Sequence, residues 1–499
     1  MSSFKKKTRQ AKNVMRKRRV IAISALLLAL SASAAAGQDL AAYKQEALQE
    51  TEQLRETLRH LAQELWRYAE TALQEERSAA LLAEALEAEG FRVQRGVAGM
   101  PTAFIAEWGS GRPIIGILAE YDALPGVGNA PVPERHSRED GVSSGHGCGH
   151  NLFGAASTVG AIVLKRMMER HRIPGTVRLY GTPAEETVVG KVYMARAGVF
   201  DDLDAAIEWH PGTETAVRNQ PGRAMNNFIV RFHGQAAHAS ADPWNGRSAL
   251  DAVELMNHAA NMMREHVHPT ARIHYVITDG GEAPNVVPER AEVWYYVRDI
   301  NRERVEFMYE WLKKMAEGAA LMTRTEYEIE FITGVHEVLL NRPLQEAVQA
   351  NLELVGPPRF DAQEQQFARR LQEFLKIEPV GLDTTIKPLP EGPEPPRGGS
   401  TDVAEVSWIT PTVGFTVATA ARNVPWHSWA TTACHGTSIG YKGAEVAAKV
   451  IAATGLDMLL RPELLQAARE EFLRLTGGRP YQSPLPPDQP PPLPSRTDR

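Results

Sequence analysis

The residues best suited to chemistry begin in the segment His146-Gly147-Cys148-Gly149-His150, where glycines alone separate a thiol from two imidazoles. Thiolate and imidazole are ligands that zinc and other divalent first-row metals prefer. The chain has one further cysteine, Cys434, so a structural disulfide is the alternative interpretation. Cys434 does not lie between two histidines in this way. We therefore interpret Cys148 as a metal thiolate and Cys434 as a small buried hydrophobic residue.

A pair of adjacent carboxylates, Glu185 and Glu186, follows the strand-like run Val177–Tyr180. Two carboxylates at a strand end repel each other unless a cation compensates them. A metal would separate their roles, because one carboxylate would bind it while the other takes a proton from a water and passes it to a leaving amine. Taken alone, such a pair is more often a solvated surface feature, so its neighbours decide the interpretation.

The next predicted strand closes with His210, in Glu208-Trp209-His210-Pro211-Gly212. A lone histidine there would more often be a structural group than a ligand. Strand ends on one side of an open sheet lie together, however, so Cys148, His150, Glu186 and His210 are expected to converge. Mixed sulfur, nitrogen and oxygen ligands suit zinc or another divalent metal.

These residues need a sheet to position them, and the pattern around them predicts one. Helical periodicity runs through Asp39–Gly90, and strand-like runs then alternate with a helix: Thr102–Ala106, Ile114–Ala119, helix Leu152–Arg170, Gly175–Tyr180 and Ala205–Glu208. This alternation indicates an α/β layered sheet.

From about Gly222 the pattern changes to that of a small α+β module inserted into the larger domain. Its expected elements are strand Asn227–Phe232, helix Ala249–His266, strands Ile273–Thr278 and Arg290–Arg298, and helix Arg302–Gly318. We therefore divide the chain into 38–221 and 336–476 for the larger domain and 222–335 for the module. The Pro-rich stretch Lys387–Arg397 is expected to be a surface loop, and the Pro-rich tail 477–499 to be disordered.

Charge and hydropathy describe the rest of the chain. With 55 basic and 61 acidic residues the net charge is -6, which gives no reason to expect a nucleic-acid partner. Residues 1–37 contain nine basic residues and no acidic one, then the apolar run Val20–Leu30 and a series of small residues. This order is typical of a signal peptide, and the run is shorter than the roughly 20 residues of a membrane anchor. We predict export, to a periplasm or the exterior, after cleavage.

Four motifs resemble the M20 metallopeptidase family in its amidohydrolase branch: Glu120–Pro125, Gly145–Asn151, Pro183–Glu186 and Gly234–Ala239. The resemblance covers roughly Leu58–Thr454. It implies a metal-dependent exopeptidase-like catalytic domain of α/β class, with the inserted α+β module as a lid and dimerisation domain, and a homodimer.

The resemblance also implies two divalent ions, zinc or manganese. Cys148 would bridge them, His150, Glu186 and His210 would complete most of the ligand set, and Glu185 would be the base. Where other branches have a histidine ligand this sequence has Glu120, and Asp122 would orient the ligands. The last ligand would be His427, with His435 as the competitor.

In the module, His238 would reach the partner subunit's site as an oxyanion donor, and Asn285 and Arg298 would hold the substrate carboxylate. The implied function is cleavage of the amide bond of an N-acyl or N-aroyl amino acid, aminobenzoyl-glutamate among them, or of a short peptide. Three alternatives stay open: a dipeptidase or carboxypeptidase of the same family, a cysteine-nucleophile hydrolase using Cys148, and a non-catalytic metal-binding or peptide-binding protein.

Overall fold

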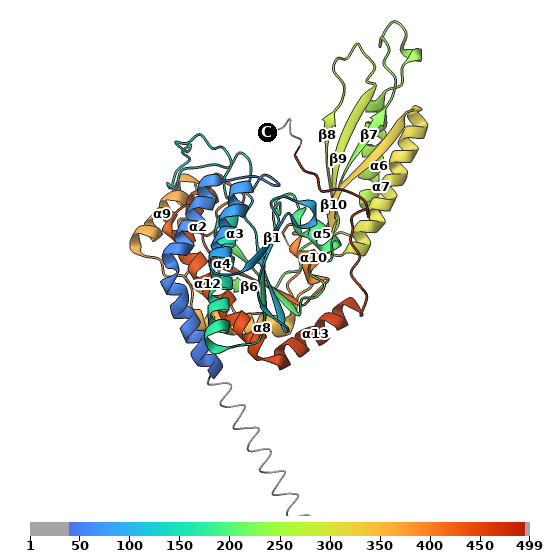
Figure 1. The fold of residues 1–499 in the computed structure, drawn as a ribbon. Helices are drawn as coiled ribbons and strands as arrows, with labels where there is room; N and C mark the ends of the chain where they lie inside the picture. Colours follow the sequence, from blue (N-terminus) through green and yellow to red (C-terminus); the bar gives the residue numbers. More distant parts are fainter. Residues whose placement is uncertain (1–38, 397, 495–499) are drawn as a thin grey trace, which may run out of the picture.

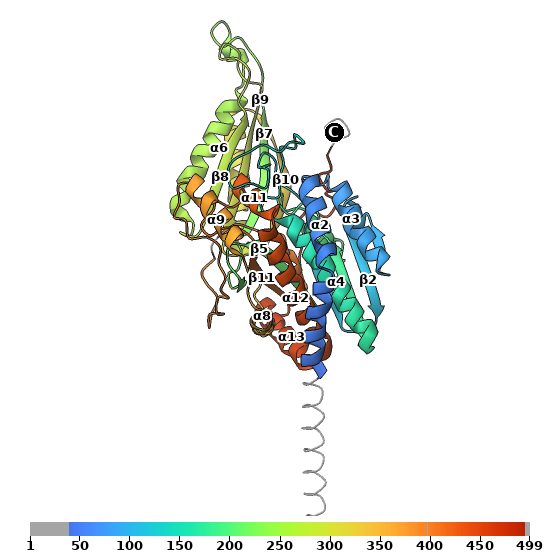
Figure 2. The same cartoon turned by 90° about the vertical axis from the view of Figure 1, so that its left-hand side faces the viewer.

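The computed structural model describes residues 39–396 and 398–494 (Figures 1 and 2). The predicted signal peptide, residues 1–37, lies outside the described residues, so export stays a prediction. Within the described part of the chain, every helix is too short or too polar to cross a membrane.

A seven-stranded sheet forms the centre of the larger domain, in the order β1-β2-β4-β3-β5-β11-β6. The strands are β1 (Arg92–Arg95), β2 (Phe104–Ser110), β3 (Ile114–Ala119), β4 (Gly175–Gly181), β5 (Ala205–Gly212), β6 (Ala216–Val217) and β11 (Thr412–Ala418). The four central strands, β4, β3, β5 and β11, are parallel. Strands β2 and β6 pair antiparallel with β4 and β11, and β1 pairs antiparallel with β2. The predicted α/β layered architecture is confirmed. Because the central strands are parallel, their carboxyl ends meet at one edge.

Helices cover the sheet, and two of them are buried along most of their length. The helices of this domain are α2 (Arg55–Tyr68), α3 (Glu76–Ala88), α4 (His150–His171), α5 (Gly190–Arg196), α8 (Arg342–Val355), α9 (Ala362–Phe374), α10 (Val403–Ser407), α11 (Trp429–His435), α12 (Ser438–Leu460) and α13 (Pro462–Thr476). Figure 2 shows α2, α4 and α12 side by side. A Cβ at Gly160 would lie 2.8 Å from Ile451, so glycine there allows α4 and α12 to approach closely.

A second, four-stranded antiparallel sheet has the order β10-β7-β9-β8 and its own hydrophobic core. Its elements are β7 (Ala224–His233), α6 (Ala249–Met263), β8 (Arg272–Asp279), β9 (Arg290–Asp299), α7 (Arg302–Thr323) and β10 (Glu326–Val335). Both helices pack on one face, on the side away from the larger domain (Figure 1). We call this unit the lid. The opposite face, here called the open face, joins the larger core at its base through Met225 and Val335.

The C-terminal segment, residues 477–494, corrects the prediction of a disordered tail. Its carbonyl groups are bound by side chains of α5: Arg196 donates to Pro486 O and Gln489 O, at 2.6 Å each, and Tyr193 donates to Pro490 O at 3.0 Å. Gln489 in turn donates to the carbonyl of Ile332 in β10 at 2.9 Å. The segment therefore connects the larger domain to the lid, as the dark red coil in Figure 1 shows.

Candidate metal centre

The predicted ligands and the base lie where parallel strands end. His150 is the first residue of α4, directly after Gly149 with φ +87°. Glu185 and Glu186 follow β4, and His210 lies near the end of β5. His427, with φ +56°, lies in the loop between β11 and α11. Because β4, β5 and β11 end at one edge of the sheet, four distant segments meet there.

Cys148 is common to two groups of ligand atoms. Its Sγ lies 3.3 Å from His210 Nε2 and 3.3 Å from His427 Nε2. The ligand atoms of Cys148, His150 and His210 all lie within 4.8 Å of one another, and so do those of Cys148, Glu186 and His427. A thiolate shared by two groups is the arrangement that a bridging ligand between two metal ions requires.

Buried polar atoms at this point fit a metal ion. Glu186 Oε1 and His150 Nε2 are buried without a hydrogen-bond partner within the described chain. His150 Nε2 lies 3.2 Å from Glu120 Oε2 but without hydrogen-bond geometry. Buried polar atoms of this kind cost free energy unless they are satisfied. Divalent ions would satisfy both atoms, and the sulfur, nitrogen and oxygen donors suit a first-row metal.

Asp122 holds two members of the set in place. Its Oδ1 lies 2.9 Å from His150 Nδ1, which directs Nε2 of the ring toward the site, and its Oδ2 accepts the main-chain N–H of Glu186 at 2.9 Å. Burial alone would raise the pKa of Asp122, but the His150 charge and these hydrogen bonds hold it below its usual value.

The electrostatics of the site favour a cation. Burial raises the pKa of the Cys148 thiol, and the Glu186 charge raises it further. Burial also raises the pKa of Glu186 to about 7. Glu185 has a pKa well above its usual value, through burial and then the negative charges of Glu120 and Asp402. These shifts describe donor groups that are costly to ionise together, and a bound divalent cation reverses that cost. A cysteine nucleophile would also leave Glu185, Glu186 and His210 without a role, which argues against the cysteine-hydrolase alternative.

Sequence reasoning missed a buried lysine beside the site. The ammonium of Lys191, in α5, lies 2.7 Å from Glu120 Oε1 and 2.7 Å from Asp402 Oδ1, and all three side chains are almost fully buried. Asp402 also accepts the main-chain N–H of Lys191 at 2.8 Å. This ion pair fixes Glu120 against His150. The available signal was a lone lysine five residues after Glu186, in a short and otherwise mostly apolar helix.

The two C-terminal histidines have different surroundings. His427 lies against Cys148 and, at 3.5 Å, against Glu186 Oε2. His435 is buried elsewhere, with Nδ1 2.7 Å from His146 O and Nε2 3.2 Å from Thr419 Oγ1. Burial lowers the pKa of His435 to about 4. Its ring nitrogens therefore have protein partners, whereas the His427 ring points into the cluster.

The predicted substrate residues of the lid are not brought together within one chain. His238 and Asn285 are exposed beyond the start of β9, where Ala239 N–H donates to Asn285 O. Arg298 lies near the other end of β9. Eight residues of strand separate Arg290 from Arg298, a span of roughly 26 Å. Asn285 and Arg298 of one chain therefore cannot hold the same carboxylate group.

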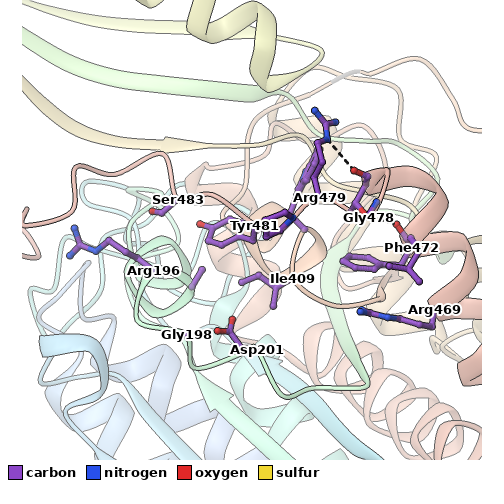
Figure 3. A pocket seen from close by; sticks show the side chains of 15 residues that line it. Arg196, Gly198, Asp201, Ile409, Arg469, Phe472, Gly478, Arg479, Tyr481 and Ser483 are labelled. Carbon is purple, nitrogen blue, oxygen red and sulfur yellow. Dashed lines mark hydrogen bonds between the residues drawn. The ribbon is translucent and has the colours of Figure 1, made fainter.

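A cavity of about 510 Å³ lies apart from the metal cluster, between α5, α10, α13 and the C-terminal segment (Figure 3). Its lining includes Arg196, Asp201, Arg469, Arg479 and Tyr481 and none of the predicted site residues. The three arginine side chains point in different directions (Figure 3). They do not form a common anion site.

Comparison with known proteins places this geometry in a class. The family description "Peptidase dimerisation domain" of M20 matches residues 223–321. The chain is 39% identical, over 85% of its own length and 94% of the relative's, to one of the subunits of the p-aminobenzoyl-glutamate hydrolase of Escherichia coli. It is 31% identical, over 84% and 89%, to the human Xaa-Arg dipeptidase.

A solved structure of a dinuclear metal-binding peptidase of the M20 family from Bacillus subtilis shares the fold. It has a TM-score of 0.53 and 20% identity, and the match covers 80% of this chain and 99% of that one. The fold and relatives define a metal-dependent hydrolase of linear amide bonds. The chain belongs to the M20 family, as the motifs predict.

Proposed function

We propose that this enzyme cleaves the amide bond of an N-acyl or N-aroyl amino acid, with two divalent ions held by Cys148, His150, Glu186, His210 and His427. The observation that carries the proposal is that the Cys148 thiol belongs to two ligand groups at once, with Glu185 beside them. The donor set suits zinc, and manganese is the alternative.

Glu185 is the proton carrier of this proposal. The ions, when bound, supply Lewis acidity toward a water and toward the scissile carbonyl. Glu185 takes the proton of that water and donates it to the leaving nitrogen. Its side chain is 12% exposed, with a carboxylate oxygen 3.9 Å from His150 Nε2. Burial and neighbouring carboxylates raise the pKa of Glu185, which helps it to keep the proton until the amine leaves.

Three further parts of the proposal concern substrate, assembly and location. The names of both relatives describe a substrate with an amino acid, glutamate or arginine, on one side of an amide bond. Arg298 has a guanidinium without a carboxylate partner in the described chain. His238 would act as an oxyanion donor in the site of a second subunit, in a homodimer. Because the Escherichia coli relative is named as one subunit of its enzyme, a different partner chain is the alternative. Export would follow from the basic and apolar order of residues 1–37.

The test is a hydrolysis assay on N-aroyl amino acids, with zinc or manganese added, and on the matching amino-acid amides. We expect turnover of the free acids alone. Glu185→Gln should keep about two ions per chain yet lose roughly 10²–10⁴-fold in turnover, because an amide cannot accept the proton. The exposed Glu391→Gln is the matched control and should behave as wild type. Turnover of Glu185→Gln within threefold of wild type would contradict the assignment.

A further inference from the structure

Two arginines on the open face of the lid have no carboxylate among the described residues to neutralise them. Arg272 of β8 and Arg298 of β9 are direct cross-strand partners, so their side chains leave the sheet on the same face. The Arg272 guanidinium donates to the carbonyls of Pro269 and Ala271, and Arg298 Nε is buried without a hydrogen-bond partner in the described chain. Like charges directly opposite destabilise a sheet. An anion bound between them would remove that cost.

An aromatic hollow adjoins the two arginines. The next cross-strand pairs on the same face are His274 with Tyr296 and Val276 with Trp294, and with Tyr275 they line a cavity of about 330 Å³. The Arg298 guanidinium lies 5.4 Å from the centre of the Tyr296 ring. Trp294 is held by a hydrogen bond from its indole N–H to Asn227 Oδ1. The hollow thus combines an ordered apolar wall with two cations at one end.

The electrostatic potential around the two arginines is positive. The pKa of His274 is lowered by burial and then by the charges of Arg298, Arg264 and Arg272. The pKa of Arg298 is lowered by burial and by the nearby Arg223. A basic side chain would be repelled here, whereas a carboxylate would be attracted.

The hollow is connected to the candidate metal centre through one row of the lid sheet. Asn227 donates to the hydroxyl of Tyr296 at 3.3 Å, and its cross-strand partner on β10 is Thr333. The Thr333 hydroxyl donates to the carbonyl of Val188 at 2.6 Å, two residues after Glu186. Tyr296 is two strand spacings, roughly 10 Å, from Thr333. The row therefore leads from the aromatic hollow to the segment that carries Glu185 and Glu186.

We propose that Arg272 and Arg298 together bind the two carboxylates of an acidic amino acid, the amine product of the reaction. One carboxylate pairs with each guanidinium, and the methylene groups between them lie beside Tyr296, the next side chain of β9 on this face. Arg272 is then the residue that selects an acidic over a neutral or basic amino acid. The inference rests on the proposed function and narrows it, since it favours glutamate-like over arginine-like substrates.

The experiment compares kcat/KM for the aminobenzoyl conjugates of glutamate, glutamine and arginine in wild type, Arg272→Gln and Arg290→Gln. Glutamine has nearly the shape of glutamate without its side-chain charge. Wild type should prefer the glutamate conjugate to the glutamine conjugate by about tenfold or more. Arg272→Gln should abolish this preference and leave the glutamine conjugate unchanged. Arg290→Gln, which removes a charge from the opposite end of β9, should keep the preference.

Calorimetric titration with free glutamate and free glutamine gives a readout that needs no turnover. Arg272→Gln should weaken glutamate binding about tenfold and leave glutamine binding unchanged. If conjugates are cleaved without an Arg272-dependent preference, the proposed reaction stands and this inference is wrong. If no conjugate is cleaved while glutamate binding depends on Arg272, the site stands and the reaction is wrong. Equal loss for both conjugates in Arg272→Gln also overturns the inference, because it indicates a structural role.

Discussion

Among single residues, the contacts of His427 and His435 allow the sharpest distinction. His427→Ala should lower bound metal and turnover together, because its ring lies against Cys148 and Glu186. His435→Ala should keep the metal and lower the melting temperature, because it removes the two buried hydrogen bonds of the ring to His146 O and Thr419 Oγ1, at about 1–3 kcal/mol together. The bound metal per chain and the melting temperature of both variants show which histidine is a ligand. Metal loss in His435→Ala alone would move the ligand role to that residue.

The sequence could identify the metal-binding residue types because their chemistry is local. Cys148 and His150 share one short motif, and Glu185 and Glu186 are adjacent. The ion pair of Lys191 with Asp402 could not be predicted in this way. The two residues are 211 positions apart. The sequence around Lys191 does not indicate which distant carboxylate neutralises its charge.

At the scale of elements, strands with clear apolar runs were predicted well, and Ile114–Ala119 agrees with β3 at both ends. Strand β10 was missed, because its outer half alternates glutamates with apolar residues and is largely exposed. The C-terminal segment was misjudged for a related reason. Proline-rich composition predicts that a segment forms no core of its own, but it does not reveal that donors such as Arg196 bind its carbonyls.

Arg196→Ala should release the C-terminal segment. Two charge-assisted hydrogen bonds are lost, so the detached state should become more populated, by roughly tenfold or more. Chymotrypsin cleavage after Tyr481 should accelerate, by less than this factor because Glu405 still binds the Tyr481 hydroxyl, when detachment is fast compared with cleavage. Arg469→Ala is the matched control, since Arg469 lines the same cavity and stacks on Phe472. Equal cleavage rates in all three proteins would mean that Arg196 does not hold the segment.

In the whole molecule, the length of the lid separates the proposed carboxylate-binding arginine from the two other residues predicted to contact the substrate. Arg298 lies at the base of the lid, whereas His238 and Asn285 lie beyond its far end. A single chain cannot bring these groups to one small substrate. Family motifs predicted each residue but not the distance between them, because strand register places residues in space only after the sheet has formed.

A mixture of His238→Ala and Glu185→Gln chains should therefore regain activity that neither has alone. In a heterodimer, one site combines an intact Glu185 with the partner subunit's intact His238. Random pairing predicts recovery of about a quarter of wild-type activity. Two different affinity tags, used in successive purification steps, must show that mixed dimers form. Mixed dimers without activity would place His238 in the site of its own chain or outside any site.

Because of the position of Cys148, bound metal should affect how long the enzyme stays active as well as how fast it turns over. The thiol is 5% exposed and lies between two histidine rings. In the oxidising compartment to which the proposed signal would lead, burial and the raised pKa slow the oxidation of an unligated Cys148 thiol, but slow conversion to sulfenic and then sulfinic acid is not reversed at the second step. Divalent ions, when bound, would engage the sulfur lone pairs that otherwise react with an oxidant. Protein stored for long in air without metal should therefore lose the ability to bind metal again. Its loss of activity would then depend on how long it was exposed to air, and not on the metal present during the assay.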